Sequence, residues 1–383
     1  MVLATGLSLC SCGKNKSKEI VIEPEIPAGT VTTLGDYKNF TYEFFDTSMT
    51  EEEAVAQYES YVTTYSAQGE KSIAPVEERD GTAVEEGDAI FFNYSATVDG
   101  EEIVAKRYGK ITVGEGTFNF DAFENALVGL TIGEESKVTI TLPDDFADAA
   151  YAGKDADFTI NVLFVYEEAE LTLETGCYWL GVGSLEEAYA GIISTYEAQM
   201  ETQKNNFMAQ QKNNYIQQVI DGSEFKNLDD DIENSYWIAY SMYDTMAKEA
   251  GQTVEAYVLE NTSYESLADF EKGLKTQAEN HIKELVTFNA VADAEGLEFG
   301  DAEYQAQVVQ LAGENGSAVY DDSGVLDRAA TVEKFEAQYE EYYGPGALEY
   351  YARITYCEDV MFEKYATEVK EAEVATEDNA TEE

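Results

Sequence analysis

The chain is poor in the residues that most enzymes use for acid–base or metal chemistry. Its 383 residues include one histidine, four cysteines and two tryptophans. It has no glycine-rich phosphate loop ending in Lys-Ser/Thr and no Gly-x-Ser-x-Gly element. The single histidine, His281, has no cysteine or carboxylate at ligand spacing and is expected to be structural. Metal, nucleotide and hydrolase functions are therefore not predicted, and we expect no cofactor.

Basic side chains are scarce as well. Lys and Arg number 23 against 77 Asp and Glu, which gives a formal charge of −54. Such a surface repels phosphate, so it argues against nucleic-acid binding and against lying on an anionic membrane. The acidity can simply keep the chain soluble; attraction of basic or unfolded cationic polypeptides is the alternative. No apolar run approaches the ~18 residues that span a bilayer, so membrane attachment would need a lipid.

Two of the four cysteines lie at the start, in Leu9-Cys10-Ser11-Cys12-Gly13-Lys14. This element resembles a bacterial lipobox in which Cys12 is the lipidated residue. Residues 1–9 lack a basic segment, so the sequence is expected to begin inside a longer signal peptide, and an ordinary N-terminus is the alternative. Cys177 and Cys357 lie in different predicted elements and fit either a disulfide or two small buried residues.

Proline occurs five times, and beyond residue 184 only once, at Pro345. Apolar residues at helical spacing in that region predict long helices, with Gly251 and Gly296 as stops. Asp229-Asp230-Asp231 lacks the glycine and distal glutamate of a calcium loop and fits a helix N-terminus. Upstream, Thr50 is expected to cap an acidic helix that ends near Ala67. The helices expected after it cover residues 184–220, 229–250, 263–295, 301–312, 331–343 and 347–365.

Strand patterns dominate residues 84–168. Alternation from Ile90 to Val98 predicts a strand, and Asp99-Gly100 predicts a tight turn after it. Alternating runs at 138–142 and 158–164 predict further strands. Before these runs, Asp121-x-x-Glu124 is expected to open a short helix as a capping box, and Gly129 is expected to end it. We therefore predict an antiparallel sheet wrapped around one short helix.

The order of these pieces resembles the FKBP-type peptidyl-prolyl isomerase domain, in the form found within trigger factor. The likeness covers about a fifth of the chain and rests on the ordered set of elements rather than on any one of them. The later helices, by their order, resemble the C-terminal chaperone domain of trigger factor, a body with two projecting arms. The matching elements of the isomerase segment are Gly87-Asp88, Asn93-Tyr94-Ser95, Val98-Asp99-Gly100-Glu101-Glu102, Gly114-x-Gly116, Phe123-Glu124, Gly129, Gly133-Glu134-Glu135, Leu142-Pro143 and Gly153-Lys154-x-Ala156-x-Phe158.

The resemblance implies a cleft for prolyl peptide bonds. Prolyl isomerisation needs no acid or base, because its barrier of about 18–20 kcal/mol arises from amide resonance. An apolar pocket lowers this barrier by favouring the twisted amide. The catalytic residues implied by the family are Tyr94, Phe123 and Phe158. Each of these side chains could instead be an ordinary core aromatic. Substrate-binding residues would be Phe118, Phe120, Phe146 and Tyr151, and no metal ligand is implied.

Two departures from the family pattern bear on catalysis. In the family an aromatic and an acidic residue usually follow the Asp-Gly turn, and in this chain their places are taken by Ile103-Val104-Ala105-Lys106. In the family the turn before the short helix supplies a backbone N–H to the substrate carbonyl. Here the sequence of that turn differs and reads Asn119-Phe120-Asp121-Ala122. A weak isomerase is the first hypothesis, and a non-catalytic surface-binding protein on the same scaffold is the alternative. The ribosome-docking segment of the family has no counterpart, so ribosome binding is not predicted.

The expected fold class is α+β, with a small antiparallel FKBP-like sheet on a short helix and an extended all-helical domain with projecting arms. The expected function is prolyl isomerisation and chaperoning of unfolded or nascent exported polypeptides, outside the cytoplasm and attached to the membrane through a lipid. A short strand is expected at residues 34–38. The expected segments are a partial lipoprotein signal (1–12), a flexible tether (13–30), a strand and helix leading into the isomerase domain (31–75), the isomerase domain (76–168), the helical chaperone domain (169–365) and a disordered acidic tail (366–383).

Overall fold

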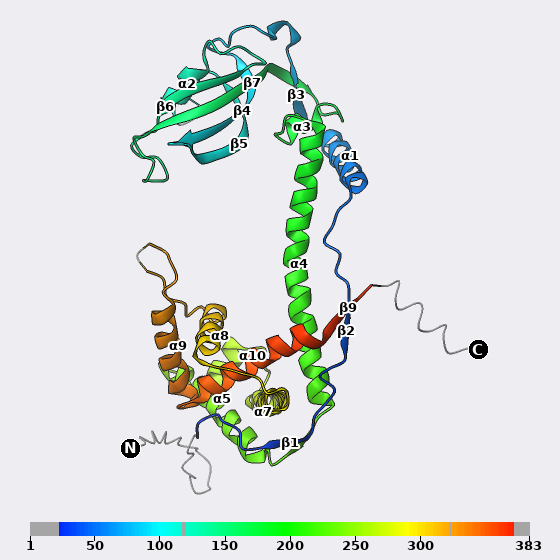
Figure 1. Cartoon of the computed structure of the whole chain (residues 1–383), viewed down its shortest axis with the longest axis vertical. Coiled ribbons are helices and arrows are strands. Elements are labelled where there is room, and N and C mark those ends of the chain that lie inside the picture. Colours follow the sequence, from blue (N-terminus) through cyan, green and yellow to red (C-terminus); the bar gives the residue numbers. More distant parts are fainter. Residues whose placement is uncertain (1–22, 117–119, 322, 371–383) are drawn as a thin grey trace, which may run out of the picture. The chain divides into compact units, whose positions relative to one another are not determined.

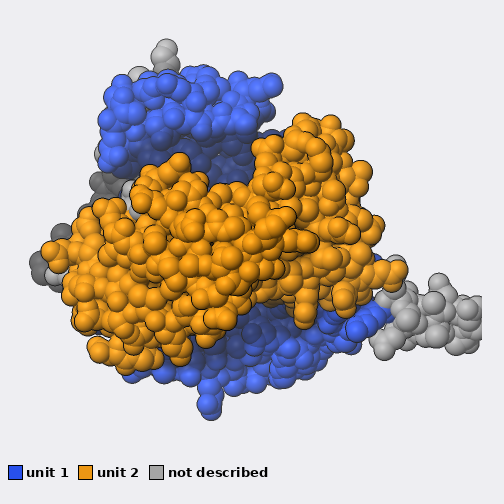
Figure 2. All heavy atoms as spheres, turned by 90° about the horizontal axis from the view of Figure 1, so that it is seen from above, with its two compact units in different colours: residues 1–45, 205–383 blue, residues 46–204 orange. Residues whose placement is uncertain are grey.

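The structure, a computed structural model, describes residues 23–116, 120–321 and 323–370. These residues form an antiparallel sheet and a large helical region, which confirms the predicted mixture of helix and sheet. The chain divides into two compact units, residues 1–45 with 205–383 and residues 46–204 (Figure 2). We call the first the helical unit and the second the sheet unit. The segment boundaries expected from the sequence remain predictions.

The sheet unit contains a five-stranded sheet (Figure 1). Its strands are β3 (Lys71–Pro75), β4 (Ala89–Val98), β5 (Glu101–Thr112), β6 (Glu135–Thr141) and β7 (Asp155–Glu170). β4 lies between β5 and β7, while β6 and β3 pair with the first and last parts of β7. Every one of these pairings is antiparallel, as the alternating pattern predicts. A short 3-10 helix, η1 (Glu77–Arg79), lies between β3 and β4 in the chain.

The turn predicted at Asp99-Gly100 is confirmed. The two residues have φ of +53° and +84°, a backbone that a two-residue hairpin requires and that Asp-Gly adopts readily. The register between β4 and β5 then shifts twice, between Tyr94 and Ala96 and between Ala96 and Thr97. Such β-bulges change the direction in which neighbouring side chains point. The hairpin is therefore irregular along the stretch that holds the candidate site.

A short helix, α2 (Asp121–Leu127), packs on one face of this sheet through Phe123 and Leu127. The predicted capping box is wrong, because the helix begins at Asp121 itself, with Phe120 as N-cap and no side-chain cap. Glu124 instead accepts a hydrogen bond from the N–H of Gly116 at 3.1 Å. Gly129 follows the helix with φ of +87°, a left-handed conformation suited to glycine at a helix end.

The acidic helix α1 (Glu51–Ala67) begins as predicted. The Thr50 hydroxyl accepts a hydrogen bond from the N–H of Glu53 at 3.3 Å, and the Glu53 carboxylate accepts one from the N–H of Thr50 at 2.8 Å. Two further helices, α3 (Gly176–Trp179) and α4 (Leu185–Asp221), complete the sheet unit, and residues 205–221 of α4 belong to the helical unit. Tyr58 of α1 is buried in a cluster with side chains of α3 and α4.

The helical unit confirms most of the helices expected from apolar spacing. Its core joins Tyr215 of α4 to later helices through residues such as Phe288 and Ile354. One helix was not predicted, and another begins at Leu267 after its N-cap Ser266 rather than at residue 263. The helices are α5 (Asp229–Glu249), α6 (Val254–Asn261), α7 (Leu267–Glu295), α8 (Asp301–Glu314), α9 (Arg328–Tyr343) and α10 (Ala347–Tyr365), of which α6 is the one not predicted.

Two pairs of short strands close the helical unit. β1 (Thr30–Thr33) pairs antiparallel with β8 (Glu224–Lys226), and β2 (Phe40–Glu43) pairs in parallel with β9 (Ala366–Val369). The strand predicted at residues 34–38 is wrong, since these residues connect β1 to β2. The tail was expected to be disordered from residue 366, and β9 corrects this for its first four residues.

Residues 23–30 do not form the flexible tether expected there. Glu25 is only 5 % exposed, and its carboxylate lies 3.2 Å from Nε2 of His281 on α7. The N–H groups of Ala28 and Gly29 donate to the carboxylate of Asp231, at the start of α5. These contacts hold the segment against the helical unit and give His281 the structural role predicted for it. Residues 13–22, and Cys12 before them, lie outside the described residues.

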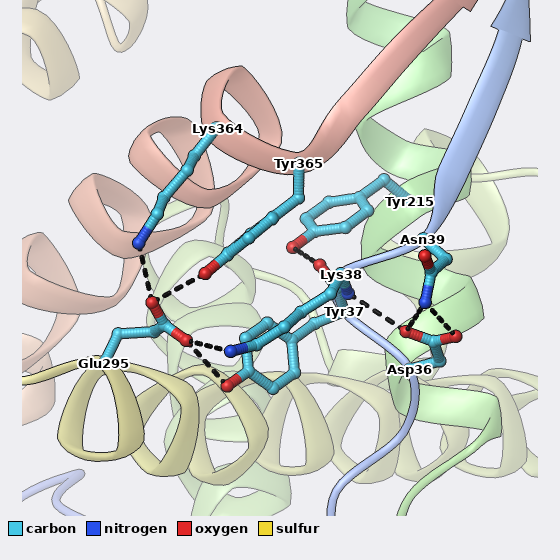
Figure 3. A network of polar contacts seen from close by, with 8 residues as sticks. All are labelled: Asp36, Tyr37, Lys38, Asn39, Tyr215, Glu295, Lys364 and Tyr365. Carbon is cyan, nitrogen blue, oxygen red and sulfur yellow. Dashed lines mark hydrogen bonds and ion pairs between the residues drawn. The ribbon is translucent and has the colours of Figure 1, made fainter.

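A polar network around Glu295 ties the segment after β1 to the ends of α7 and α10 (Figure 3). The Glu295 carboxylate lies 2.7 Å from the ammonium groups of both Lys38 and Lys364. It also accepts hydrogen bonds from the hydroxyls of Tyr37 at 2.9 Å and Tyr365 at 2.7 Å. These contacts lower the pKa of Glu295 well below its ordinary value, with the hydrogen bonds from Lys364 and Lys38 as the largest causes.

Cys177 and Cys357 are buried free thiols, one in each unit, so the disulfide left open by the sequence is not formed. Burial raises the pKa of the Cys357 thiol to about 12, and the neighbouring charge of Glu358 adds to the effect. Both residues act as small apolar side chains. Within the described part of the chain, no helix combines the length and the hydropathy needed to cross a bilayer.

Candidate functional site

The candidate site lies on the face of the sheet that α2 covers. Alternate residues of β4 and β7 point to this face because side chains alternate along a strand. They form one apolar cluster with the residues of α2, and most of its members are fully buried. The principal contributors are Ile90, Phe92 and Ala96 of β4, Phe158, Ile160 and Val162 of β7, and Phe123 and Leu127 of α2.

The three predicted catalytic aromatics meet in this cluster. The ring centroid of Phe123 lies 5.2 Å from that of Tyr94 and 5.2 Å from that of Phe158. The rings of Tyr94 and Phe158 are 6.5 Å apart. These separations are typical of favourable aromatic pairs, and β4, β7 and α2 each supply one of the rings.

The predicted substrate-binding aromatics border the same cluster. Phe120, Phe146 and Tyr151 are half-buried and pack against it, Phe120 with its ring 6.4 Å from Phe123. Phe118 lies outside the described residues. The structure thus brings the described members of the predicted site together, while their roles stay predictions.

Exposure divides the site into two parts, which we call the floor and the rim. The floor consists of Phe123 and Phe158, which are 0 % and 5 % exposed, so little of either ring can touch a substrate. The rim is formed by half-buried aromatics, which are the groups that a bound peptide would meet. They are Tyr94, Phe120, Phe146 and Tyr151.

Two aliphatic residues complete the rim and were not predicted as site residues. Ile103 and Val104 are neighbours in β5, and both are half-buried and pack against the cluster. Neighbours in a regular strand point to opposite faces, so the two register shifts opposite Ala96 explain how both reach the site. The sequence signal for them was their position shortly after the Asp99-Gly100 turn, behind Glu101 and Glu102.

The rim carries two hydroxyl groups, those of Tyr94 and Tyr151, and the Tyr94 ring contacts both rings of the floor. Burial raises the pKa of Tyr94, and the nearby charge of Arg107 acts in the opposite direction. The phenol is therefore protonated at neutral pH and can donate a hydrogen bond. An aromatic and aliphatic surface with hydroxyl donors can hold an apolar ring and orient a carbonyl, which suits a reaction without acid–base chemistry.

The chain is similar to known proteins in its sequence. Residues 81–163 match the family described as FKBP-type peptidyl-prolyl cis-trans isomerase. Trigger factor of Halothermothrix orenii is 27 % identical over 301 residues, which cover 77 % of this chain and 65 % of that protein. Trigger factor of Geobacillus kaustophilus is 26 % identical over 303 residues, covering 78 % and 67 %. The chain also aligns with a solved structure of the trigger factor chaperone, from work on promiscuous substrate recognition in folding and assembly. The identity is 15 % and the TM-score 0.32, over 88 % of this chain and 79 % of that one.

The sheet, its helix and the aromatic cluster define an FKBP-type peptidyl-prolyl isomerase domain. Beyond that domain, the similarity extends over most of the helical region, and the chain is a trigger factor-like protein. It spans about two thirds of the length of the relatives that it matches, 65 % in the first case.

Proposed function

We propose that the chain is a peptidyl-prolyl cis-trans isomerase and chaperone that acts on unfolded polypeptides. The observation that carries the isomerase half is the half-buried aromatic rim over a buried aromatic floor, in a domain that matches the FKBP type. A proline ring placed against the rim would leave water, and the adjoining amide would lie in an apolar environment. That environment favours the twisted amide over the planar one, because the twisted form has less charge separation. The Tyr94 hydroxyl can donate a hydrogen bond to the carbonyl oxygen.

The floor supports the rim rather than touching the substrate. Phe123 and Phe158 hold Tyr94 in place through ring contacts of 5.2 and 6.5 Å. They also exclude water from beneath a bound proline, since Phe123 is 0 % exposed and Phe158 only 5 %. Replacements in the rim should therefore change activity more than stability, and replacements in the floor should change stability first.

Tyr94→Ala should lower kcat/KM for a prolyl tetrapeptide at least about tenfold, which corresponds to ~1.4 kcal/mol of transition-state stabilisation. The variant removes both a ring from the rim and the hydroxyl donor. The measurement is a protease-coupled isomerisation assay on the full chain. Tyr166→Ala is the matched control, because Tyr166 is a half-buried aromatic of β7 that packs on the opposite face of the sheet. It should retain the wild-type rate.

Two outcomes separate the readings. If the wild-type chain gives no rate enhancement at micromolar concentration, the isomerase proposal is wrong and the alternative, a non-catalytic binding protein on this scaffold, is favoured. If Tyr94→Ala and Tyr166→Ala lose activity equally, the loss reflects general damage to the sheet. The replacement of the usual aromatic by Ile103 and Val104 supports a weak rather than a strong isomerase.

The chaperone half rests on similarity to trigger factor beyond residues 81–163. We expect the full chain to suppress aggregation of an unfolded model protein at stoichiometric concentration. The Tyr94→Ala variant should suppress it equally well, because the rim lies in the sheet unit and the helices lie mostly in the other. Unchanged light scattering by the model protein would refute this half without affecting the isomerase proposal.

Location outside the cytoplasm on a lipid anchor is also proposed, from the Cys12 element alone. Exported polypeptides would then be the substrates. Palmitate labelling in a bacterial host tests the anchor: label on the wild-type chain that is lost in Cys12→Ser supports it, and label that persists in the variant refutes it.

A further inference from the structure

The helical unit contains a cavity that the proposed function does not use. Its volume is about 370 Å³, within the usual range of roughly 300–1,000 Å³ for small-ligand sites. Four helices surround it, namely α4, α7, α8 and α10. Gln217, Gln310 and Glu314 on its wall are exposed, whereas Gln307, Thr355 and Glu358 are buried. The cavity therefore runs from solvent to a buried end.

The cavity wall is rich in hydrogen-bond acceptors and negative charge. It carries the carboxyl groups of Glu284, Glu314, Glu358 and Asp359. Its one basic side chain is Lys212, whose ammonium group is 2.5 Å from the Asp359 carboxylate and so already has a partner. Amide side chains add further acceptor oxygens. The NH₂ group of Gln307 donates a hydrogen bond to the Thr355 hydroxyl at 3.1 Å, and the side-chain oxygen of Gln307 can accept one.

Glu358 is the notable group at the buried end. It is only 3 % exposed, and its Oε1 atom has no hydrogen-bond partner among the described residues. An unsatisfied buried carboxyl oxygen destabilises a fold by about 1–3 kcal/mol, more if it is charged, so such a group in a cavity wall points to a missing donor. The described residues contain no group of three or more His, Cys, Asp or Glu side chains arranged to hold a metal ion. The missing donor is thus better supplied by N–H groups than by a metal.

We propose that this cavity binds an organic cation through its guanidinium or alkylammonium group, with Glu358 as the principal acceptor. Such groups carry several N–H donors and a positive charge, which match a wall of carboxylates and amide oxygens. The cation can belong to a free amine or to an arginine or lysine side chain of a polypeptide, since the recognising chemistry is the same. This site goes beyond the proposed isomerase and chaperone activities and lies in the unit that does not hold the aromatic rim.

Proton linkage gives the site a signature. Burial is the largest cause that raises the pKa of Glu358 well above its ordinary value, and the charge of Glu284 from α7 and a hydrogen bond with its side chain add to the rise. Lys212 of α4 acts in the opposite direction. Asp359 of α10 adds to the rise, and Glu314 of α8 is the remaining charged group on the wall. A cation placed against Glu358 favours its ionised form, so binding should release a proton and should strengthen as the pH rises.

The test is isothermal titration of the full chain with agmatine, which carries both a guanidinium and an ammonium group, in two buffers of different ionisation enthalpy. We expect binding with release of up to one proton. Glu358→Gln should weaken binding at least about tenfold, because a cation that lowers the pKa of Glu358 by one unit gains a tenfold preference for its ionised form. The variant should also abolish proton release. Glu363→Gln, at an exposed glutamate of the same helix, should bind agmatine like the wild type.

Further arms identify the source of the cation and guard against misfolding. N-acetylarginine amide mimics a polypeptide side chain: binding of both probes indicates that side chains are accepted, and binding of agmatine alone indicates a free amine. N-acetylcitrulline amide is the neutral counterpart and should not bind. If Glu358→Gln fails to fold, Glu284→Gln supplies the second variant and should also weaken binding. The proposal is overturned if neither cation binds, if citrulline binds as well as arginine, or if the folded cavity variants bind like the wild type.

Discussion

Replacing Phe123 with alanine should lower the free energy of unfolding of the sheet unit by about 3–5 kcal/mol, the range found for buried phenylalanines. The ring is 0 % exposed and contacts the rings of Phe92, Tyr94 and Phe158 at 6.0, 5.2 and 5.2 Å. Its removal leaves a cavity between α2 and the sheet that the rigid strands cannot close. Phe123→Leu keeps most of the volume and should cost much less, because volume-conserving replacements are tolerated best.

The two tryptophans allow this loss to be assigned to one unit. Trp179 of α3 lies in the sheet unit and Trp237 of α5 in the helical unit. In a Trp237→Phe background, fluorescence during urea unfolding reports the sheet unit, and Phe123→Ala should shift this transition strongly. In a Trp179→Phe background the transition of the helical unit should stay in place. A shift below about 1 kcal/mol in the first background would show that the ring does not fill the core as described.

The hairpin and the acidic helix α1 could be predicted because their signals are local. Asp99-Gly100 has the positive φ values that an Asp-Gly pair readily adopts, and Thr50 with Glu53 satisfies the backbone of its own first turn. Asp121-x-x-Glu124 has a similar pattern, yet the structure uses it differently. There the packing of Phe120 and Phe123 on the sheet sets the start of the helix, and Glu124 bonds Gly116 eight residues earlier. Tertiary contacts override the local signal in this helix.

The short strands and the buried N-terminal segment could not be predicted, because their partners are distant in sequence. β2 and β9 are four residues each and pair across more than 300 positions of the chain. A four-residue run is too short to show a periodicity. Glu25 likewise looks like an ordinary polar residue until His281, 256 positions later, provides its partner.

The aromatic members of the candidate site were predicted through resemblance, and the structure places the described ones in one cluster. Their division into floor and rim could not be predicted, since it depends on how closely distant parts of the chain pack around each ring. Ile103 and Val104 were missed for another reason. Strict alternation would send one of the two away from the site, and only the bulges in β5 bring both to it.

Glu295→Gln should destabilise the helical unit by about 2–3 kcal/mol at neutral pH, in the range for hydrogen bonds to a charged group. The Glu295 side chain is only 10 % exposed, whereas Lys38 and Lys364 are 51 % and 50 % exposed, so solvent weakens the two ion pairs. The tyrosine hydroxyls are half-buried partners that an amide oxygen satisfies less well than a carboxylate (Figure 3). The loss should appear in the Trp179→Phe background, where Trp237 reports the helical unit.

The effect should vanish in acid. The pKa of Glu295 is lowered in the folded chain, so its contribution is fully present above the unfolded-state value of about 4.3 and decreases as the pH falls below it. Wild type and Glu295→Gln should therefore differ most above about pH 5 and converge at lower pH, as urea unfolding at a series of pH values can show. Glu363→Gln, at an exposed position of α10, controls for removal of one negative charge from a very acidic chain and should leave stability nearly unchanged. A gap between wild type and Glu295→Gln that stays constant from neutral pH to pH 3 would contradict the assignment, because it would mean that the network does not depend on an ionised carboxylate.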